Sequence, residues 1–564
     1  MGIDSRVSKN TSQTTAQPQA PAKIEPIVNR RVMDSGIQLL REHKHKELWK
    51  QTCGFVDLSL SEVMNIQKRL LLEQMQRLNS SEIGRSVMRG AAPRTVSEFR
   101  KQVPLTTYKD YSAFLLKRRE DVLPVKPMFW GHTSGRTGEY DYKWCPLTSG
   151  QWEEIEKLTF AAFSFCSCNE REDIKIRLHD KLLYGSAPAP YVTGLLSRYA
   201  FSRIFDFLPD LDEAESMSFQ ERGKQGITQA LSRGLDFYNA LPSVLVNVGE
   251  RMGQGGGKKN IKALLSNPRF AARILRGVLR SKMAHRPMLP KDVWNLKGLI
   301  SAGSDASVYK EKIKAMWGRT PLDMYACTEG LVISLQTWDY EGLCFYPSLN
   351  FFEFIEEADV LKAKLDSTFV PPTVLLDEVE AGHNYQLVIS NFHGGPFTRY
   401  IVGDMIRIVA RRNDKLNIDI PQMVYHSRVD DMIDIAGFTR LTESVIWKAL
   451  EKSGITYEDW TARRELKNTP VLHLYIEMKG KDGHAPEHYA GLVHEQLKTL
   501  DKPYAELEAL LGLKPLEVTL IPQGAFNRYM LNQMQAGVEL GRMKVSHLNP
   551  PDKVIDFLLN YKNS

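Results

Sequence analysis

The sequence predicts an α/β protein with more than one domain, and three observations lead to this prediction. The chain has 564 residues, which at about 150 residues per domain suggests three to four structural units. After residue 295, short apolar runs alternate with amphipathic helical stretches, as they do in layers of strands and helices. A further unit begins near residue 428, and its run at 471–479 alternates between apolar and polar positions.

Composition excludes several classes of protein. Charged residues make up 25% and hydrophobic residues 43% of the chain, which is ordinary for a globular protein and excludes a wholly disordered one. The formal net charge of +7 is too small to require a nucleic-acid partner. Six cysteines without a CxxC pair indicate thiols in a reducing compartment. There is no signal-peptide core and no apolar run of about 18 residues, so we expect a cytoplasmic protein without a membrane span.

The helices are expected where apolar residues recur at helical spacing. Residues 1–25 are rich in Ser, Thr, Gln and Pro and have few large apolar residues, so this segment is predicted to be a disordered tail. The stretch 196–290 is predicted to be mostly helical. The individual helices are predicted at 61–78, 149–165, 268–286, 305–317 and 486–500.

The helix predicted at 268–286 carries a basic stripe. Phe270, Ile274 and Val278 fall on one side of it, and its arginines fall on another. Such a stripe could meet an anionic partner, or it could be a solvated face.

The strands are expected in short apolar or alternating runs that are bounded by turn-forming residues. No internal repeat of fixed period interrupts this pattern. The predicted strands are 296–301, 321–325, 331–337, 350–356, 384–390, 404–410, 471–479 and 515–521.

The first segment that points to chemistry is HTSGRTGEYDYKW at 132–144. Its hydroxyl side chains can donate hydrogen bonds, and its glycines let backbone N–H groups approach an anion closely. Lys143 could add a positive charge. The chain has no GxxxxGK[ST], GxSxG or HExxH motif. The loop at 132–144 is therefore the candidate phosphate site. The alternative is an ordinary surface turn, because Gly, Ser and Thr cluster in such turns as well.

Two later segments place a carboxylate at a strand end. In MYACTEG at 324–330, Glu329 could hold Mg²⁺ or could be an exposed acid at a turn. In RYIVGDMIRI at 399–408, Asp404 follows a glycine, where a carboxylate can accept hydrogen bonds from a ribose. The alternative for Asp404 is an ordinary Gly-Asp hairpin turn.

A fourth segment, 427–446, follows these two at the predicted domain boundary. Arg428 and Asp430 lie at its start. It could equally be a charged linker bounded by helices.

The order and spacing of these segments resemble the acyl-adenylate-forming superfamily. The chain is most similar to the auxin-responsive acyl-acid amido synthetases and their bacterial relatives, with phenylacetate-CoA ligases next. The resemblance spans roughly 100–548 and includes the segments 103–111, 299–318 and 524–548. It implies a large N-terminal adenylate-forming domain at 26–427. It also implies a small mobile α+β C-terminal domain at 428–564, with a hinge near 428–434 that includes Asp430.

The resemblance also implies roles for individual residues. Glu329 would bind Mg²⁺ and act in catalysis, and Lys544 would contact the reacting carboxylate and the α-phosphate. Arg136 stands where the family usually has a small or hydroxyl residue, and it could clamp pyrophosphate or narrow the site. The residues implied to bind ATP are Thr133, Ser134, Gly135, Arg136, Thr137, Gly138, Gly303, Ser304, Tyr325, Thr328, Asp404 and Arg428.

The activity implied by the resemblance is a two-step ligation that uses ATP and Mg²⁺. A small carboxylic acid becomes an acyl-AMP, and the acyl group then passes to an amine such as an amino acid, giving an amide. Coenzyme A is the alternative acceptor, and the arginines at 269–286 could offer its phosphate a basic surface. A third reading is a nucleotide-binding module that has lost catalysis. Aromatic residues at 191–205 permit an aryl or fatty acid, or they pack in the core.

Overall fold

The computed structural model of the chain describes most of the sequence in separate stretches. They are residues 31–132, 143–186, 188–217, 219–253, 267–301, 306–366, 368–428, 432–435, 439–466, 470–480, 483–501, 504–505, 516–535 and 545–560. The predicted tail at 1–25 therefore lies outside the described residues.

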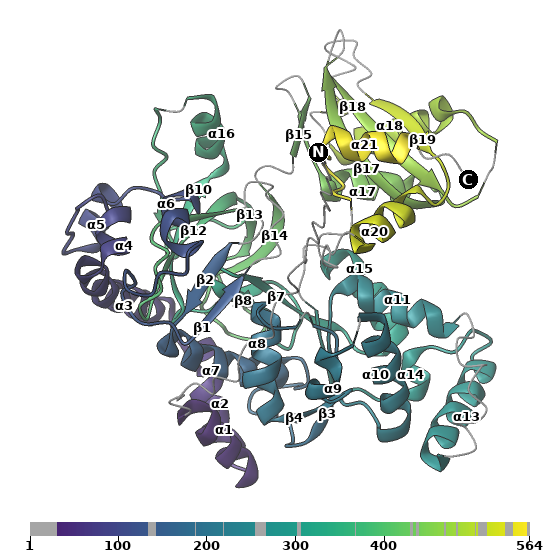
Figure 1. The fold of residues 1–564 in the computed structure, drawn as a ribbon, viewed down its shortest axis with the longest axis horizontal. Coiled ribbons are helices and arrows are strands. Elements are labelled where there is room, and N and C mark those ends of the chain that lie inside the picture. The colour runs from purple at the N-terminus through teal and green to yellow at the C-terminus, as the bar shows by residue number, and fades with distance from the viewer. Residues whose placement is uncertain are drawn as a thin grey trace, which may run out of the picture.

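Among the described residues, twelve strands form one large sheet in the order β11-β10-β12-β13-β14-β9-β8-β7-β6-β5-β3-β4 (Figure 1). One half of the sheet is parallel, and the other half is antiparallel. The parallel half comprises β3 (Asp180–Tyr184), β4 (Phe205–Leu208), β5 (Phe237–Asn239), β6 (Gly298–Ser301) and β7 (Pro321–Cys327). The antiparallel half comprises β8 (Leu331–Leu335), β9 (Leu343–Phe345), β10 (Asn350–Glu356), β11 (Val374–Leu375), β12 (Asn384–Asn391), β13 (Tyr400–Ala410) and β14 (Gln422–Arg428).

Strand β7 joins the two halves, because it pairs in parallel with β6 and antiparallel with β8. A separate hairpin of β1 (Phe129–His132) and β2 (Trp144–Leu147) flanks the predicted phosphate loop. Helices connect the strands of the parallel half along the chain, and one helix, α16 (Glu357–Leu365), follows β10. The described helices between β3 and β7 are α8 (Val192–Tyr199), α9 (Leu211–Glu215), α10 (Phe219–Arg233), α11 (Pro242–Gly253), α13 (Pro268–Met283), α14 (Pro290–Val293) and α15 (Ala306–Trp317).

Helix α7 (Ser149–Phe165) lies in the centre of the N-terminal domain. It begins at a capping box in which the Thr148 hydroxyl accepts from the Gln151 N–H. Most of its circumference is buried, as expected for a helix that packs between other elements. Helices α1 (Arg31–Arg41) and α2 (His45–Thr52) pack against it. The other elements before it in the chain are the 3-10 helix at Gly54–Asp57, α3 (Leu60–Ser80), which packs on β10, α4 (Glu82–Val87), α5 (Val96–Gln102) and α6 (Lys109–Leu115).

The predicted α/β class is confirmed, and the predicted helices and strands are present with shifts of a few residues at their ends. The prediction that 196–290 is mostly helical was incomplete, because β4 and β5 lie within it. These strands are only three to four residues long and are too short to produce a periodic signal. The strand predicted at 404–410 begins earlier, at Tyr400, so Asp404 lies within β13 rather than in a hairpin turn.

The C-terminal part has its own sheet, β17 (Tyr457–Leu466), β18 (Pro470–Met478) and β19 (Leu516–Ile521), and its own hydrophobic core. Leu472, Leu474 and Ile476 of β18 are fully buried, as the alternation predicted. The opposite face is buried too, because Tyr475 packs in a second cluster with residues of α20 and α21. The remaining elements are the hairpin β15 (Met432–Ile435) and β16 (Thr439–Thr442), and the helices α17 (Glu443–Lys452), α18 (Pro486–Leu500), α20 (Ala525–Gln535) and α21 (Asp552–Leu559).

His547 ties the last described segment to the C-terminal core. Its ring stacks on Trp460 with centroids 4.5 Å apart and an interplanar angle of 9°. Its Nδ1 lies 2.7 Å from Glu443 Oε1, and its Nε2 lies 2.9 Å from Asp459 Oδ1. Burial opposes a charge on the ring, but the hydrogen bonds to Asp459 and Glu443 outweigh it and raise the pKa of His547 to about 9.

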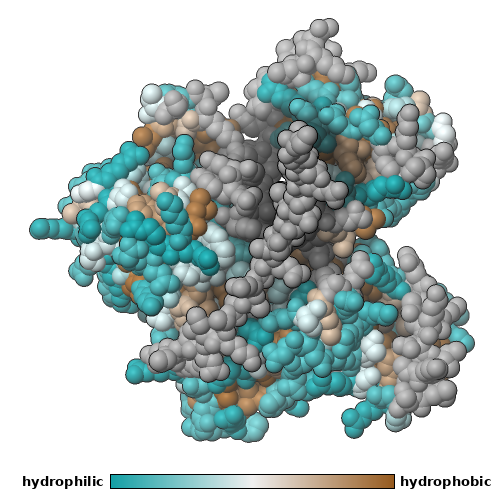
Figure 2. Space-filling view, in the orientation of Figure 1, coloured by the Kyte–Doolittle hydropathy of each residue, from teal (hydrophilic) through white to brown (hydrophobic). Residues whose placement is uncertain are grey.

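The surface visible in Figure 2 is mainly hydrophilic, and its hydrophobic residues form small separate patches. A hollow opens at the right of this view between the C-terminal domain and the helices α11 and α15 (Figures 1 and 2). Among the described residues no helix is both long and apolar enough to cross a membrane.

Candidate active site

The turn that carries Glu329 joins β7 to β8 and is fixed by two asparagines from other strands. Asn391 Nδ2 donates to the Glu329 carbonyl at 3.0 Å, and Asn350 Nδ2 donates to the Gly330 carbonyl at 2.7 Å. A Cβ at Gly330 would lie 2.6 Å from Ile389 Cδ1, so a larger residue would have to displace the tip of that side chain on β12. The backbone of the turn is therefore held in place from behind.

The Glu329 carboxylate is 9% exposed and has two neighbours on one oxygen. The Tyr400 hydroxyl donates to Glu329 Oε1 at 2.8 Å, and Lys143 Nζ lies 3.8 Å from the same atom. Burial and the adjacent Glu329 raise the pKa of Tyr400 well above its ordinary value, so its hydroxyl remains a donor. Neither contact uses Oε2.

The Asp404 carboxylate is held in a similar way by Tyr325, whose hydroxyl donates to Asp404 Oδ2 at 2.6 Å. Burial and the Asp404 charge raise the pKa of Tyr325 well above its ordinary value. Gly403 has a φ of +88° at a shift in the β12–β13 register, which is a conformation that favours glycine. Asp404 lies opposite Arg428 in the β13–β14 register.

Two tyrosine–carboxylate pairs therefore link the β7 segment to β13. Each segment supplies one tyrosine and one carboxylate, and in each segment the two residues are four positions apart. Strands β8, β9 and β14 separate β7 from β13 in the sheet order, so the sheet curves strongly to bring the two segments within hydrogen-bond distance. We call these four residues (Tyr325, Glu329, Tyr400 and Asp404) the paired-tyrosine site.

The predicted phosphate loop starts and ends beside this site. His132 and Trp144 pair at the end of the β1–β2 hairpin, and the loop residues lie between them. Lys143 is the last residue before β2 and reaches Glu329, and its Nζ also lies 5.4 Å from the Tyr108 ring centroid. Lys143, whose role the sequence left open, thus lies with its charged amine next to Glu329.

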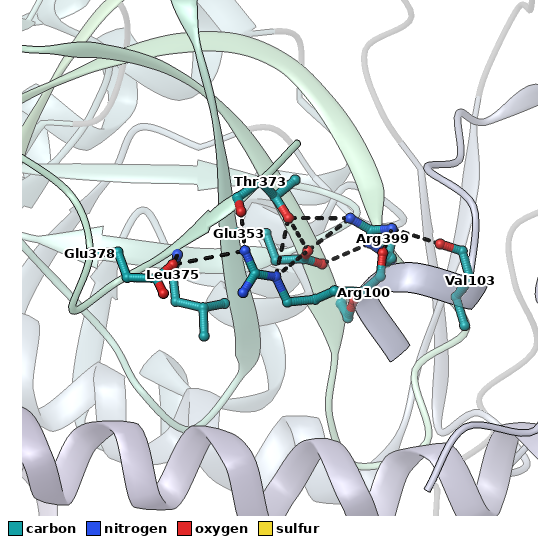
Figure 3. A network of polar contacts seen from close by, with 8 residues as sticks. Arg100, Val103, Glu353, Thr373, Leu375, Glu378 and Arg399 are labelled. Atoms are coloured by element: carbon teal, nitrogen blue, oxygen red, sulfur yellow. Dashed lines mark hydrogen bonds and ion pairs between the residues drawn. The ribbon is translucent and has the colours of Figure 1, made fainter. Parts of the chain in front are cut away.

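A buried ion pair supports the start of β13 (Figure 3). Arg399 Nε and Nη2 donate to the two oxygens of Glu353 at 3.0 and 2.9 Å, and both side chains are almost fully buried. Arg399 Nη1 also donates to the carbonyls of Arg100 and Val103 at 2.8 and 2.7 Å. Thr373 bridges the network, because its hydroxyl donates to Glu353 Oε1 at 2.7 Å. The residue after Arg399 is Tyr400, so this network fixes the strand that presents Tyr400 to Glu329.

The structure brings together only part of the predicted site. Tyr325, Glu329 and Asp404 meet as described, and Thr328 is half-buried in the same turn. Arg428 is placed by its backbone in β14. Among the described residues no group of three or more His, Cys, Asp or Glu side chains could hold a metal ion by itself. Predicted residues that lie outside the described ranges are Thr133, Ser134, Gly135, Arg136, Thr137, Gly138, Gly303, Ser304, Asp430 and Lys544.

Sequence reasoning did not single out Tyr400, Asn350 or Asn391. Tyr400 lies inside the segment chosen for Asp404, four residues earlier, which places both on the same strand. The asparagines carry no local signal, because their partners are the backbone carbonyls of residues that are 20 and 62 positions away. Of the aromatic residues considered for the acid pocket, Phe205 packs in the core with its ring centroid 4.4 Å from that of Phe163.

Three family domains match the chain. Residues 54–185 match the GH3 family N-terminal domain, 343–428 match its central domain, and 441–552 match its C-terminal domain. Together these matches cover more than half of the chain. The chain belongs to the GH3 family. The resemblance to acyl-acid amido synthetases that the sequence predicted is thereby confirmed.

Two curated plant proteins are similar to parts of this GH3 chain. Indole-3-acetic acid-amido synthetase GH3.15 of Arabidopsis thaliana is 26% identical over 220 residues, or 35% of this chain. Probable indole-3-acetic acid-amido synthetase GH3.4 of Oryza sativa subsp. japonica is 25% identical over 237 residues, or 38% of this chain. The matched regions span 34% and 35% of these relatives, which is about a third of their length.

Solved structures show that the GH3 chain has the fold of this family over nearly its full length. AtGH3.15 acyl acid amido synthetase in complex with 2,4-DB matches with a TM-score of 0.60 and 17% identity, over 95% of this chain and 97% of that one. A 2-hydroxyisobutyryl-CoA ligase in the postadenylation state matches with a TM-score of 0.52 and 13% identity, over 95% and 94%. The predicted architecture of a large N-terminal and a smaller C-terminal domain is confirmed.

Removal of the Tyr400 hydroxyl is expected to weaken the hold on Glu329 without unfolding the sheet. The Tyr400→Phe variant keeps the ring but removes the donor to Oε1, so we expect the carboxylate to become mobile. ATP–pyrophosphate exchange should then fall about tenfold. Tyr385→Phe is a matched control, because that hydroxyl is also buried in the sheet but accepts from the Glu380 N–H. Equal effects of the two changes would show that Tyr400 has no special relation to Glu329.

Proposed function

We propose that this chain activates a small carboxylic acid with ATP as an acyl-AMP and then transfers the acyl group to the amine of an amino acid, giving an amide. The observation that carries the proposal is the paired-tyrosine site with Lys143 beside it. Two carboxylates are pre-positioned there by tyrosines, at the point where the predicted phosphate loop begins and ends. The names of the plant relatives, which are amido synthetases, support the same activity.

In the first step an oxygen of the substrate carboxylate attacks the α-phosphorus of ATP. A P–O bond forms to the acid, and the bond to the β-phosphate oxygen breaks, so pyrophosphate leaves. Negative charge is spread over the phosphoryl oxygens, and catalysis therefore depends mainly on positioning and electrostatic stabilisation. We assign the β- and γ-phosphates to Thr133, Ser134, Gly135, Arg136, Thr137 and Gly138, with adenine and ribose held by Gly303, Ser304, Tyr325, Thr328, Asp404 and Arg428.

The residues around Glu329 fit a magnesium ion that is completed by substrate phosphates. Mg²⁺ typically binds one or two carboxylates together with phosphate oxygens, and the contacts of Glu329 with described residues use only Oε1, which leaves Oε2 for this role. The ion would neutralise charge on the phosphates. Lys143 Nζ, 3.8 Å from Oε1, places a positive charge beside the carboxylate.

In the second step the amine nitrogen attacks the acyl carbonyl, the C–O bond to AMP breaks, and the amine loses a proton. The attacking amine must be neutral, so the rate of this step should rise with pH toward the pKa of the amine. We propose that the C-terminal domain, residues 428–564, rotates between the two steps about a hinge at 428–434. This motion would bring Lys544 to the reacting carboxylate and the α-phosphate for the first step.

Replacing Lys544 with alanine is expected to reduce ATP–pyrophosphate exchange by about a hundredfold, because a charged contact to the transition state is lost. Transfer from a supplied acyl-AMP should be affected much less. Lys553→Ala removes an exposed lysine on α21 and serves as the control. Exchange by Lys544→Ala at the rate of the unchanged protein would remove this residue from the mechanism.

The substrates are best identified in two stages. Carboxylate-dependent pyrophosphate exchange over a panel of aryl, aliphatic and fatty acids identifies the acid. Mass spectrometry of products formed with amino acids or with coenzyme A then identifies the acceptor. A thioester in place of an amide would favour the acyl-CoA ligase alternative, and ATP binding without exchange for any acid would favour a non-catalytic nucleotide-binding module. The proposed location is the cytoplasm, where thiols such as those of this chain stay reduced.

A further inference from the structure

Helix α13 exposes an apolar stripe that nothing in the described structure covers. Leu275, Leu279 and Met283 are 60%, 53% and 81% exposed, which makes them three of the four most exposed large hydrophobic residues described. Their spacing of four residues places them on one line along the helix. A single exposed apolar residue is ordinary, but a row of three along one helix indicates a contact surface.

The same helix is anchored by its opposite face, so the exposed stripe is not the result of a loosely attached segment. Phe270, Gly277 and Ser281 are buried. Arg273 Nη1 donates to the carbonyls of Leu231 and Ser232 at 2.7 Å, which ties α13 to the end of α10. A Cβ at Gly277 would lie 2.8 Å from Met288 Sδ.

A concentrated positive charge accompanies the stripe. Between Glu250 and Asp292 the sequence contains eleven lysines and arginines and no acidic residue. These eleven cations exceed the formal net charge of +7 for the whole chain, so the rest of the chain is net negative. The four exposed cations of the helix that form no ion pair within the described structure are Arg269, Arg276, Arg280 and Lys282.

The basic surface continues into a hollow at the N-terminal end of α13. A cavity of about 570 Å³ is lined there by Lys181, Ser232, Arg233, Asn267, Pro268 and Arg269. Asp206 neutralises part of this charge, because its carboxylate pairs with Lys181 and lies 3.9 Å from Arg233. Arg269 extends the row of arginines on α13 to the edge of the cavity, with a spacing that keeps them on one side of the apolar stripe.

We propose that α13 is a docking surface for an anionic lipid bilayer, with its axis parallel to the membrane plane. The leucines and the methionine would enter the boundary of the acyl chains, while the long basic side chains reach the phosphate headgroups. Helix α13 lies at the outer edge of the molecule (Figure 1), and its 16 residues span about 24 Å, so a flat surface can approach its whole length.

Other occupants fit the charge less well. A second copy of the chain would bring the same arginines face to face, which is repulsive. The undescribed residues 1–30 contain four basic and two acidic residues, and 254–266 contain three lysines and no acid, so neither segment offers the negative charge that this surface requires. This inference does not depend on the proposed ligase activity.

The test is co-sedimentation of the full chain with vesicles. Vesicles of equal parts phosphatidylglycerol and phosphatidylcholine should bind the chain, vesicles of phosphatidylcholine alone should not, and added salt should release it. The triple variant Leu275→Ser, Leu279→Ser, Met283→Ser should lower the partition coefficient at least about tenfold. The double variant Arg276→Gln, Arg280→Gln should lower it by about tenfold or more.

Matched controls separate the surface from general charge and hydrophobicity. Lys46→Gln with Lys126→Gln removes two exposed cations elsewhere, and Val370→Ser removes an exposed apolar side chain that is not on α13; neither should change binding. Unchanged thermal unfolding of the α13 variants excludes misfolding as the cause. Lack of binding to phosphatidylglycerol vesicles at low salt overturns the proposal, as does binding that neither α13 variant reduces. Concentration-dependent dimerisation that the triple variant abolishes would instead assign the face to a second copy.

Discussion

Replacing Arg399 with methionine is expected to lower the free energy of unfolding of the N-terminal domain by about 3–5 kcal/mol. The change removes both hydrogen bonds to Glu353, a carboxylate that is only 1% exposed, and also the two to the carbonyls of Arg100 and Val103. The remaining cation near Glu353 is Arg100, whose Nε lies 3.8 Å from Oε1, which is too far to replace a two-point hydrogen-bonded pair. The Glu353 carboxylate thus stays buried without an adequate partner.

Urea unfolding of the full chain measures this effect. The double variant Arg399→Met, Glu353→Met removes both charges, so it should regain much of the lost stability even though each single variant is destabilised. Arg412→Met is the matched control, because Arg412 pairs with Asp414 and Asp419 at the surface and its loss should change stability by less than about 1 kcal/mol. A double variant that is no more stable than Arg399→Met would show that packing, not the buried charge, accounts for the loss.

The stability of the C-terminal domain is expected to fall as pH rises through about 9. The pKa of His547 is raised to about 9 in the folded chain, above an ordinary value of 6.5, because Asp459 and Glu443 bind its charged ring. A raised folded-state pKa stabilises the fold fully below the unfolded pKa and loses this contribution as pH passes the folded pKa. The shift corresponds to about 3 kcal/mol, lost between roughly pH 6.5 and 9.

Thermal unfolding of the full chain and of His547→Gln across this pH range tests the prediction. The difference in stability between the two proteins should be large near pH 6 and should shrink toward pH 9. His383→Gln is the control, because His383 is exposed and lies 3.5 Å from Glu380, so its loss should have little effect at any pH. A difference of constant size across the range would assign the role of His547 to its stacking on Trp460 rather than to its charge.

Much of the fold follows from local patterns. The helix predicted at 149–165 has the same bounds as α7, and the strand predicted at 350–356 has the same bounds as β10. These elements are long and have clear sequence boundaries. In contrast, β5 has three residues and β9 has three, and both exist because neighbouring strands supply hydrogen bonds, which no local pattern records.

The site was only partly predictable for a similar reason. Glu329 and Asp404 each lie in a short segment beside a predicted strand, and the order and spacing of these segments made them candidates. Their pairing with Tyr400 and Tyr325 depends on the curvature of a sheet in which three strands separate β7 from β13. The position of Lys143 beside Glu329 likewise depends on the β1–β2 hairpin lying against residues almost two hundred positions later.

The two reciprocal tyrosine–carboxylate hydrogen bonds between the β7 segment and β13 have a consequence for engineering the protein. A graft that replaces 324–330 alone would leave Asp404 without the Tyr325 hydroxyl that donates to it. A graft that replaces 399–404 alone would leave Glu329 without the Tyr400 hydroxyl. Only a transplant of both segments at once preserves the two carboxylates in register. The two segments therefore form one structural unit, although they lie about seventy residues apart in the sequence.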